Sequence, residues 1–300
     1  MTLYLGVDMG GTATRWAAIG TGGAVAARGE APGASGLVFE PQGRAAFLAA
    51  LGAIRAALPE TPASAHLGIT GAGHAPEAAI EDLAAEALGV PRARLSCLND
   101  VVLAWHAAFE GAPGHLIAAG TGSVGVSVDG AGRVTMVGGR GVLIDDAGSG
   151  AWIALRALDL LCRRIDAHGA PEGMEILARH LAAALGGPDW EAMRAYVYGQ
   201  GRGRIGALAV SVAAAASEGD AAALGLMRAA GDELARLARA LLGRAGPAPL
   251  AFVGGVLGLH PETKSRLEAA LPGERIAYPA LDAALHGARM ARQAATGAPA

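Results

Sequence analysis

The chain has 300 residues, which suffices for one large domain or for two of ordinary size. A formal net charge of −3 gives no electrostatic footprint for nucleic acid, and no apolar run reaches the roughly 18 residues of a membrane span. Two cysteines, Cys97 and Cys162, are too few for a disulfide framework or a four-thiolate metal site, and Asp8 interrupts the N-terminal apolar stretch, so we expect a cytoplasmic protein without a signal peptide.

The first part of the chain alternates apolar strand patterns with glycine turns and helical patterns. The strands that it predicts are 3–8, 14–19, 24–27, 65–69 and 95–98. The helices that it predicts are 44–58, 77–88 and 101–110. These elements predict an α/β domain over residues 1–112.

The order strand, turn, strand, turn, strand then occurs again, over 115–119, 124–128 and 133–137. This repetition indicates an internal duplication and predicts a second domain over residues 113–279. A helical region at 149–245 interrupts it, with predicted helices 152–166, 173–185, 190–196, 205–217 and 220–242. A strand at 250–253, a helix at 260–271 and a strand at 275–277 complete it. We expect a terminal helix within 280–293 to pack back on the first domain.

The first strand runs directly into an acid, two glycines and hydroxyl residues. Glycines let main-chain N–H groups approach an anion closely, and Thr12 and Thr14 add hydroxyl donors. Asp8 is placed to hold Mg²⁺ through water. The segment therefore predicts a phosphate-binding turn. It is not a Walker loop, because the single lysine, Lys264, has no glycine before it.

Six motifs together resemble the actin-like ATPase and sugar kinase superfamily, and within it the N-acetylglucosamine kinase branch that is grouped with the BadF/BadG/BcrA/BcrD ATPases. They are Asp8-Met9-Gly10-Gly11-Thr12, Asn99-Asp100, Gly120-Thr121-Gly122-Ser123, Gly138-Gly139, Asp146-Ala147-Gly148-Ser149 and Val253-Gly254-Gly255. The resemblance implies an α/β fold of two RNase H-like domains with a central cleft and a helical region inserted in the second half. It implies an enzyme that uses ATP and Mg²⁺ to phosphorylate a hydroxyl of an amino sugar, N-acetylglucosamine or glucosamine, at O6.

The resemblance also implies roles for single residues. Asp100 would be the general base that accepts the proton of the attacking hydroxyl, and Asp8 would hold the metal. The residues implied for the nucleotide are Asp8, Gly10, Gly11, Thr12, Thr14, Gly120, Thr121, Gly122, Ser123, Gly254 and Gly255. The residues implied for the sugar are Ser35, Asn99, Asp100, Thr121, Gly122, Arg140 and Asp146. Structural alternatives stay open, since Asp100 and Asp146 are also suited to capping the helices that follow them.

The chain departs from the family pattern at the expected sugar pocket. Where the family has Gly-Gly-Trp-Gly and then Gly-Asp-Glu-Gly-Ser, this sequence has Arg140 for the tryptophan, Asp145 for the glycine and Ala147 for the glutamate. Two interpretations follow. Either Arg140 and Asp145 pair and reshape the pocket, or Arg140 meets an anionic sugar such as N-acetylmuramate.

Two other functions remain as alternatives. An ATPase activator of a CoA-ester reductase or dehydratase would share an iron–sulfur cluster across a dimer, but Cys97 falls in a predicted strand and Cys162 in a predicted helix. A non-catalytic sugar sensor would need an added DNA-binding segment. The long helices are suited to a homodimer, and His74 follows a glycine turn from which it could reach the cleft.

Overall fold

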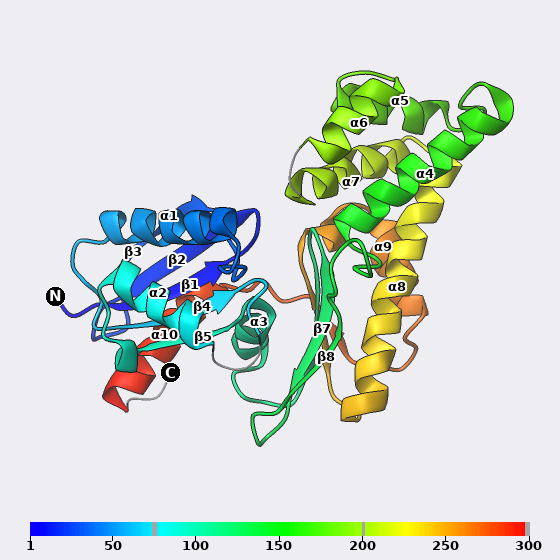
Figure 1. Cartoon of the computed structure of the whole chain (residues 1–300). Helices are drawn as coiled ribbons and strands as arrows, with labels where there is room; N and C mark the ends of the chain where they lie inside the picture. Colours follow the sequence, from blue (N-terminus) through cyan, green and yellow to red (C-terminus); the bar gives the residue numbers. More distant parts are fainter. Residues whose placement is uncertain (74–76, 200–201, 298–300) are drawn as a thin grey trace. The chain divides into compact units, whose positions relative to one another are not determined.

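The computed structural model describes residues 1–73, 77–199 and 202–297 (Figure 1), so His74 lies outside the described residues. The chain divides into two compact units. The first unit comprises Met1–Ala112 and Ala280–Ala300, and the second comprises Pro113–Pro279. Each unit contains one mixed five-stranded sheet and several helices, which confirms the α/β prediction. Among the described residues, no helix has the length and apolar character needed to cross a bilayer.

The sheet of the first unit has the strand order β3-β2-β1-β4-β5. The three strands β1, β2 and β3 form an antiparallel meander, while β4 and β5 run parallel to β1. The strands are β1 (Tyr4–Met9), β2 (Ala13–Ile19), β3 (Val25–Pro32), β4 (Ser64–Ile69) and β5 (Leu95–Asn99). The helices are α1 (Pro41–Ala57), α2 (Ala78–Leu88), the 3₁₀ turn η1 (Arg92–Arg94), α3 (Asp100–Phe109) and α10 (Ala283–Thr296).

The alternation of side chains along β1 explains how this sheet is covered on both faces. Leu5, Val7 and Met9 are buried in a core shared with α1 and α2 (Figure 1). Gly6 points to the opposite face, where a Cβ atom would lie 2.0 Å from the carbonyl oxygen of Ala284 in α10. The C-terminal helix therefore packs directly on the bare main chain of β1, and only glycine fits at this position.

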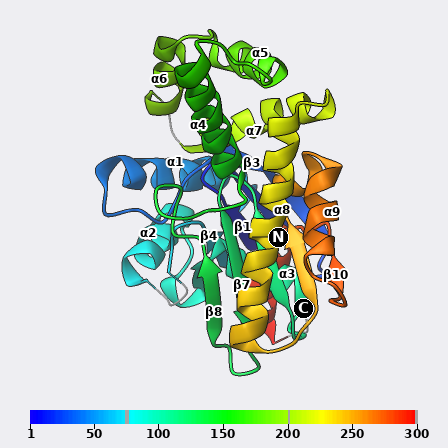
Figure 2. The same cartoon turned by 90° about the vertical axis from the view of Figure 1, so that its right-hand side faces the viewer.

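The sheet of the second unit has the order β10-β9-β6-β7-β8, and α8 packs along β6, β7 and β8 (Figure 2). The strands are β6 (His115–Ala119), β7 (Ser123–Val128), β8 (Val134–Gly138), β9 (Leu250–Val253) and β10 (Ile276–Ala277). The helices are α4 (Gly150–His168), α5 (Glu175–Leu185), α6 (Trp190–Tyr198), α7 (Arg202–Ser217), α8 (Ala221–Ala245), the 3₁₀ turn η2 (Gly255–Gly258) and α9 (Pro261–Ala269). One continuous apolar core joins the sheet to the helices.

Each element that the sequence predicted is present, with ends that mostly shift by one to four residues. The largest difference is β3, which continues to Pro32 instead of ending at residue 27. The segment 28–32 is polar and ends in proline, so it lacks the apolar alternation of a strand. Its pairing with β2 extends to Ala13 opposite Pro32, and the Thr14 hydroxyl donates to the Pro32 carbonyl at 2.9 Å. Pairing with a neighbouring strand, not local propensity, extends β3.

Candidate functional site

In the first unit, the sequence motifs meet at one edge of the sheet. The parallel register places Met9 opposite Ile69 and Ile69 opposite Asn99, so β1, β4 and β5 end side by side. The glycine turn that begins at Gly10, the hydroxyl residue Thr70 and the carboxylate residue Asp100 follow these three strand ends. Chain segments far apart in the sequence thus share one edge, where open α/β sheets bind their ligands.

The glycine turn at residues 10–12 is supported from behind. The amide of Gly10 donates to Ala13 at 3.1 Å, and the amide of Ala34 donates to Gly10 at 3.2 Å. Gly33 fits so closely that a Cβ atom there would lie 2.5 Å from the carbonyl carbon of Thr12. Gly11 and Thr12 remain exposed. The exposed main chain of the turn is therefore available to a ligand, while residues 33 and 34 hold the turn in place from the other side.

Ser35 lies in the loop that supports this turn. Its Oγ accepts a long hydrogen bond, 3.5 Å, from the amide of Leu37. The neighbouring amide of Gly36 donates to the Thr70 carbonyl at 2.9 Å, which brings the loop to the end of β4. Ser35 is partly exposed at this edge.

At the junction between β5 and α3, the two polar residues Asn99 and Asp100 make different hydrogen bonds. Asn99 is the helix N-cap, because its Oδ1 accepts from the Val101 amide at 3.1 Å. Its Nδ2 donates to the Ala72 carbonyl at 2.7 Å, so Asn99 also ties two strand ends together. Asp100 is the first residue of α3, and its carboxylate accepts from the Thr70 hydroxyl and from the Val101 amide. Asn99 is therefore the N-cap residue, and the Asp100 carboxylate shares the Val101 amide with it.

Burial, and after it the negative charge of Asp8, raise the pKa of Asp100 to about 6, against the opposing effect of hydrogen bonds from Val101 and Thr70. Burial also raises the pKa of Asp8, opposed by the positive charge of Arg15. Two carboxylates thus share one partly buried edge. Such a pair can take up a proton near neutral pH or attract a cation.

Thr70 is a residue that the sequence analysis did not select. Its signal is a hydroxyl residue directly after a buried strand and before a glycine, whereas in the first motif Thr12 follows the glycines. Thr14, by contrast, was selected from the sequence but does not face a ligand. It is fully buried, and its hydroxyl donates to the Pro32 carbonyl, so it is not available to a phosphate.

In the second unit, the corresponding glycine turn joins β6 to β7. It is a hairpin turn in which the Gly120 amide donates to the Gly122 carbonyl at 2.9 Å. Gly254 has a φ of 107° and fits so closely that a Cβ atom would lie 2.3 Å from the Ala119 carbonyl oxygen. The turn that follows β9 is therefore brought against the end of β6. A Cβ atom at Gly120 or Gly255 would meet nothing within 4 Å, so both glycines present open main chain.

The start of α4 is tied to this same turn. The Gly150 amide donates to Gly120 at 2.9 Å, and the Ala151 amide donates to Thr121 at 3.2 Å. Ser149 is the helix N-cap, with its Oγ accepting from the Trp152 amide at 3.2 Å. Asp146 therefore does not cap α4, which was the alternative that the sequence left open for it.

The Asp146 carboxylate lies next to Gly122 of the turn between β6 and β7. A Cβ atom at Gly122 would lie 2.8 Å from Asp146 Oδ2, so a side chain at position 122 would displace this carboxylate. Asp146 is 8 % exposed and has a φ of 61°. Ser123, by contrast, is buried and its hydroxyl donates to the Ala147 carbonyl at 2.7 Å, so it holds the loop instead of facing a ligand.

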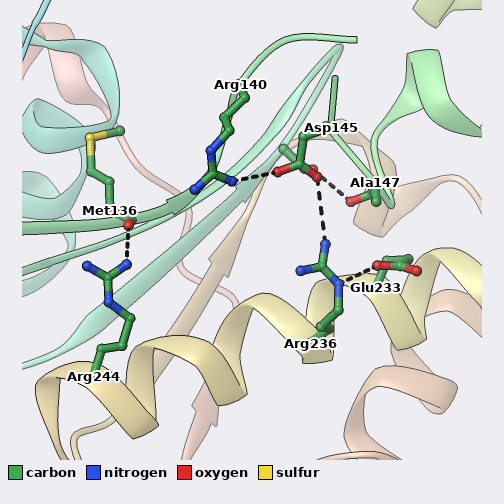
Figure 3. A network of polar contacts seen from close by, with 8 residues as sticks. Met136, Arg140, Asp145, Ala147, Glu233, Arg236 and Arg244 are labelled. Atoms are coloured by element: carbon green, nitrogen blue, oxygen red, sulfur yellow. Dashed lines mark hydrogen bonds and ion pairs between the residues drawn. The ribbon is translucent and has the colours of Figure 1, made fainter. Parts of the chain in front are cut away.

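The pairing of Arg140 with Asp145, one of the two interpretations above, is present. Arg140 Nη1 donates to Asp145 Oδ2 at 3.2 Å (Figure 3). Arg236 of α8 approaches the other oxygen of the same carboxylate at 3.7 Å. No local pattern predicts this third partner, since Arg236 lies 91 positions away from Asp145 in the sequence.

Neither cysteine lies at an exposed turn. Cys97 is buried in β5, and burial raises the pKa of its thiol to about 12. Cys162 is half-buried in α4, with its Sγ 3.6 Å from the sulfur of Met193. Among the described residues, no group of three or more His, Cys, Asp or Glu side chains is arranged to hold a metal ion.

Comparisons with solved structures identify the fold. A candidate N-acetylglucosamine kinase from Chromobacterium violaceum is 28% identical over 98% of this chain and 99% of that one, with a TM-score of 0.77. A second, from Porphyromonas gingivalis, is 17% identical over 99% and 100%, with a TM-score of 0.68. A ROK family glucokinase from Streptomyces griseus, in complex with glucose and AMPPNP, is 18% identical over 95% and 97%, with a TM-score of 0.53. The two-unit α/β fold predicted from the sequence, that of actin-like ATPases and sugar kinases, is thereby confirmed.

No curated protein matches the chain. The model of the BadF/BadG/BcrA/BcrD ATPase family matches residues 5–285. Because this match spans nearly the whole chain, as the six motifs led us to expect, the protein belongs to the BadF/BadG/BcrA/BcrD ATPase family.

Proposed function

We propose that this protein is an ATP-dependent kinase that phosphorylates a hydroxyl of an amino sugar. The observation that carries the proposal is the pair of partly buried carboxylates, Asp8 and Asp100, at the strand edge that also presents the exposed turn at Gly11. The 28% identity with a candidate N-acetylglucosamine kinase supports the acceptor class. A cytoplasmic location, where ATP is available, and a small-molecule sugar partner are part of this proposal.

Asp100 is the proposed general base. Its raised pKa lies close to neutral pH, the range in which a base is both deprotonated and able to accept a proton. The Thr70 hydroxyl and the Val101 amide fix the orientation of its carboxylate. Asn99 positions Asp100 by capping α3 and linking β5 to Ala72, and Ser35 is the proposed polar contact to the sugar from the neighbouring loop.

Asp8 is the proposed residue for Mg²⁺. A single carboxylate suits this ion, because Mg²⁺ keeps several waters and takes its other ligands from phosphate oxygens. When bound, the ion would neutralise charge on the transferring phosphoryl group. The exposed main chain of Gly11 and the hydroxyl of Thr12 are suited to donate to phosphate oxygens, with Gly10 shaping the turn.

In the second unit, the open glycines carry the proposed nucleotide contacts. Thr121 and Gly122 would donate to phosphate oxygens beside the open main chain of Gly120, whose own amide already donates to the Gly122 carbonyl. Gly254-Gly255 would lie against the adenosine, where the open side of Gly255 leaves room. Asp146 would accept hydrogen bonds from sugar hydroxyls. Thr14 and Ser123 are left out of this proposal, because their hydroxyls already donate to carbonyl groups.

The identity of the acceptor is proposed as N-acetylglucosamine or glucosamine, phosphorylated at O6. Arg140 already pairs with Asp145, which makes its charge less available to an anionic acceptor such as N-acetylmuramate. Buried Cys97 and half-buried Cys162 give no support to an activator that shares an iron–sulfur cluster. A homodimer is a prediction that sedimentation velocity would test.

An ADP-release assay across glucosamine, N-acetylglucosamine, N-acetylmuramate, N-acetylmannosamine and glucose tests the proposal. We expect turnover with one of the first two sugars. Asp100→Asn should lower kcat by roughly 10²–10⁴-fold, since it removes the base, while acceptor affinity measured by calorimetry stays within about threefold.

The matched control is Asp82→Asn, which changes an exposed acid of α2 and should leave kcat unaltered. Turnover of Asp100→Asn at the wild-type rate would remove the base assignment. Absence of turnover on every sugar, together with an iron–sulfur absorption band on anaerobically purified protein, would favour the activator instead.

A further inference from the structure

The loop between β8 and α4 rests on one helix, α8. A Cβ atom at Gly138, where the loop begins, would lie 2.8 Å from Leu237 Cδ2. A Cβ atom at Gly148, where it ends, would lie 3.0 Å from the Ala230 carbonyl oxygen. Both ends of the loop therefore contact the same stretch of α8 main chain and side chains. This loop carries Asp146, the residue proposed to hold the sugar hydroxyls.

Asp146 adopts a backbone conformation that needs support. Its φ of 61° lies in the left-handed region, which residues other than glycine enter uncommonly, although Asp does so more readily than most. On its C-terminal side, the Ser149 amide donates to the Asp146 carbonyl at 3.0 Å, and Ser123 holds Ala147. On its N-terminal side, the neighbour Asp145 is held twice, because its amide donates to the Gly141 carbonyl at 2.8 Å and its side chain pairs with two arginines.

The Asp145 carboxylate bridges the loop to the helix. Its Oδ2 accepts from Arg140 Nη1 at 3.2 Å, and its Oδ1 lies 3.7 Å from Arg236 Nη2 (Figure 3). The Arg236 guanidinium is itself oriented by Glu233, whose Oε2 accepts from its Nε at 2.7 Å. The Asp145 side chain is only 16 % exposed, whereas Arg140 and Arg236 are 62 % and 50 % exposed, so solvent still screens this network in part.

We propose that Arg236 is a positioning residue for the acceptor. By pairing with Asp145, it holds the loop so that the neighbouring Asp146 carboxylate stands over Gly122. In this role Arg236 acts through Asp145 on Asp146 and not by contact with a ligand. The inference rests on the proposed function, and it adds a determinant of acceptor affinity on a helix that none of the sequence motifs reaches.

The test compares steady-state constants of the full-length protein. Arg236→Gln should raise the KM for the amino sugar about three- to tenfold, the range expected when a partly buried ion pair is lost. The KM for ATP and kcat should stay within about twofold. Arg236→Lys keeps the charge and should keep the acceptor KM within about twofold of wild type.

Arg244→Gln is the matched control, because Arg244 lies on the same helix and donates to the Met136 carbonyl at 2.9 Å in β8 (Figure 3). It should leave the acceptor KM unchanged. Asp145→Asn should raise the acceptor KM at least as much as Arg236→Gln does, because it also weakens the pairing with Arg140. The double variant Asp145→Asn/Arg236→Gln should be no worse than Asp145→Asn alone, since the contact with Arg236 is already lost in that single variant.

Three results separate the inference from the proposed function. If wild-type protein turns over no sugar, the proposed function fails and the inference fails with it. If wild-type protein is active and Arg236→Gln leaves the acceptor KM unchanged, only the inference fails. An equal rise in the KM values for sugar and ATP, together with a lower Tm, would show a merely structural role for Arg236 and would also overturn it.

Discussion

At the scale of single residues, the first unit places charge where folding alone would not favour it. Asp100 lies against the end of a buried strand, and desolvation is the largest cause of its raised pKa, followed by the charge of Asp8. A raised carboxyl pKa means that the folded state prefers the protonated acid. At neutral pH the ionised carboxylate therefore reduces the stability of the fold. Such opposition between stability and chemistry is typical of functional sites.

Asp100→Asn should consequently stabilise the protein while removing its activity. The folded pKa is raised from 3.8 to about 6, so the destabilisation is absent below pH 3.8 and complete above pH 6. After allowance for solvent screening, we expect the variant to gain about 1–2 kcal/mol at pH 7 and almost nothing at pH 4. Urea denaturation at both pH values measures this gain. A loss of stability at pH 7 would contradict the electrostatic account.

His66 provides the opposite pH dependence. The ring is buried in β4, and its Nδ1 forms a hydrogen bond with Ser96 Oγ at 2.5 Å. Among the described residues, its Nε2 has no hydrogen-bond partner. Burial lowers the pKa of His66 from 6.5 to about 4, with the charges of His106 and His286 acting in the same direction. The folded state thus holds the neutral ring. Stability is unaffected above pH 6.5 and decreases as the pH falls from 6.5 to 4, by up to about 3 kcal/mol.

His66→Asn should flatten this acid dependence, because the amide can still pair with Ser96 but does not titrate. We expect the difference in unfolding free energy between pH 7 and pH 5 to shrink by about 1–2 kcal/mol relative to wild type. The control is His168→Asn, at a half-exposed histidine that pairs with Glu172. An unchanged pH dependence in His66→Asn would show that other groups govern the acid transition.

At the scale of elements, a few polar side chains hold whole helices in place. Asp220 is the N-cap of α8, and its Oδ1 accepts from the amides of Ala222 and Ala223, both at 3.0 Å. Its Oδ2 accepts from the Leu177 amide of α5 at 3.0 Å. One carboxylate therefore satisfies the N-terminal ends of two helices, where the helix dipole favours negative charge. Because α8 also supports the loop that carries Asp146, the position of this helix matters to the site.

Asp220→Ala should be more damaging than the loss of an ordinary cap. Asp220 is only 3 % exposed, so its removal leaves the buried amides of Leu177 and Ala223 and the partly buried amide of Ala222 without an acceptor, at a cost of about 3 kcal/mol. The matched variant is Asp189→Ala, which removes the exposed cap of α6 and its single bond to Ala192, at a cost of about 1 kcal/mol. Urea midpoints compare the two variants. Equal losses would show that the link from Asp220 to α5 contributes nothing.

At the scale of the whole molecule, the sequence predicted what depends on local signals. Buried strands, glycine turns and helix caps are recognised within a few residues. The element order, the two related sheets and the edge at Gly10 and Asp100 could therefore be predicted. The hydrogen-bond partners of two hydroxyl groups could not. Thr14 donates to Pro32 and Ser123 donates to Ala147, across 18 and 24 positions. Arg236 lies still farther from Asp145, and only the folded chain brings such partners together.

The first unit also depends on the far end of the chain, which gives a prediction about truncation. α10 packs on β1, β2 and β4, the Ser64 hydroxyl donates to the Ala291 carbonyl at 2.8 Å, and Arg28 pairs with Asp282 at 2.9 Å. A chain that ends at Pro279 would expose the face of the sheet that Gly6 presents, together with apolar side chains that α10 covers. Because the second unit has its own core, we expect it to stay folded while the first unit unfolds.

Limited proteolysis with mass spectrometry measures this outcome. The truncated chain should yield a resistant fragment that corresponds to residues 113–279, with rapid loss of residues 1–112. A control chain that ends at Thr296 retains all of α10 and should resist digestion throughout both units. Equal resistance of residues 1–112 in the two chains would mean that the five-stranded sheet, with α1 and α2 on one face, is stable without its terminal helix. The close approach of α10 to Gly6 argues against that result, since this approach removes main chain and apolar side chains from water at once.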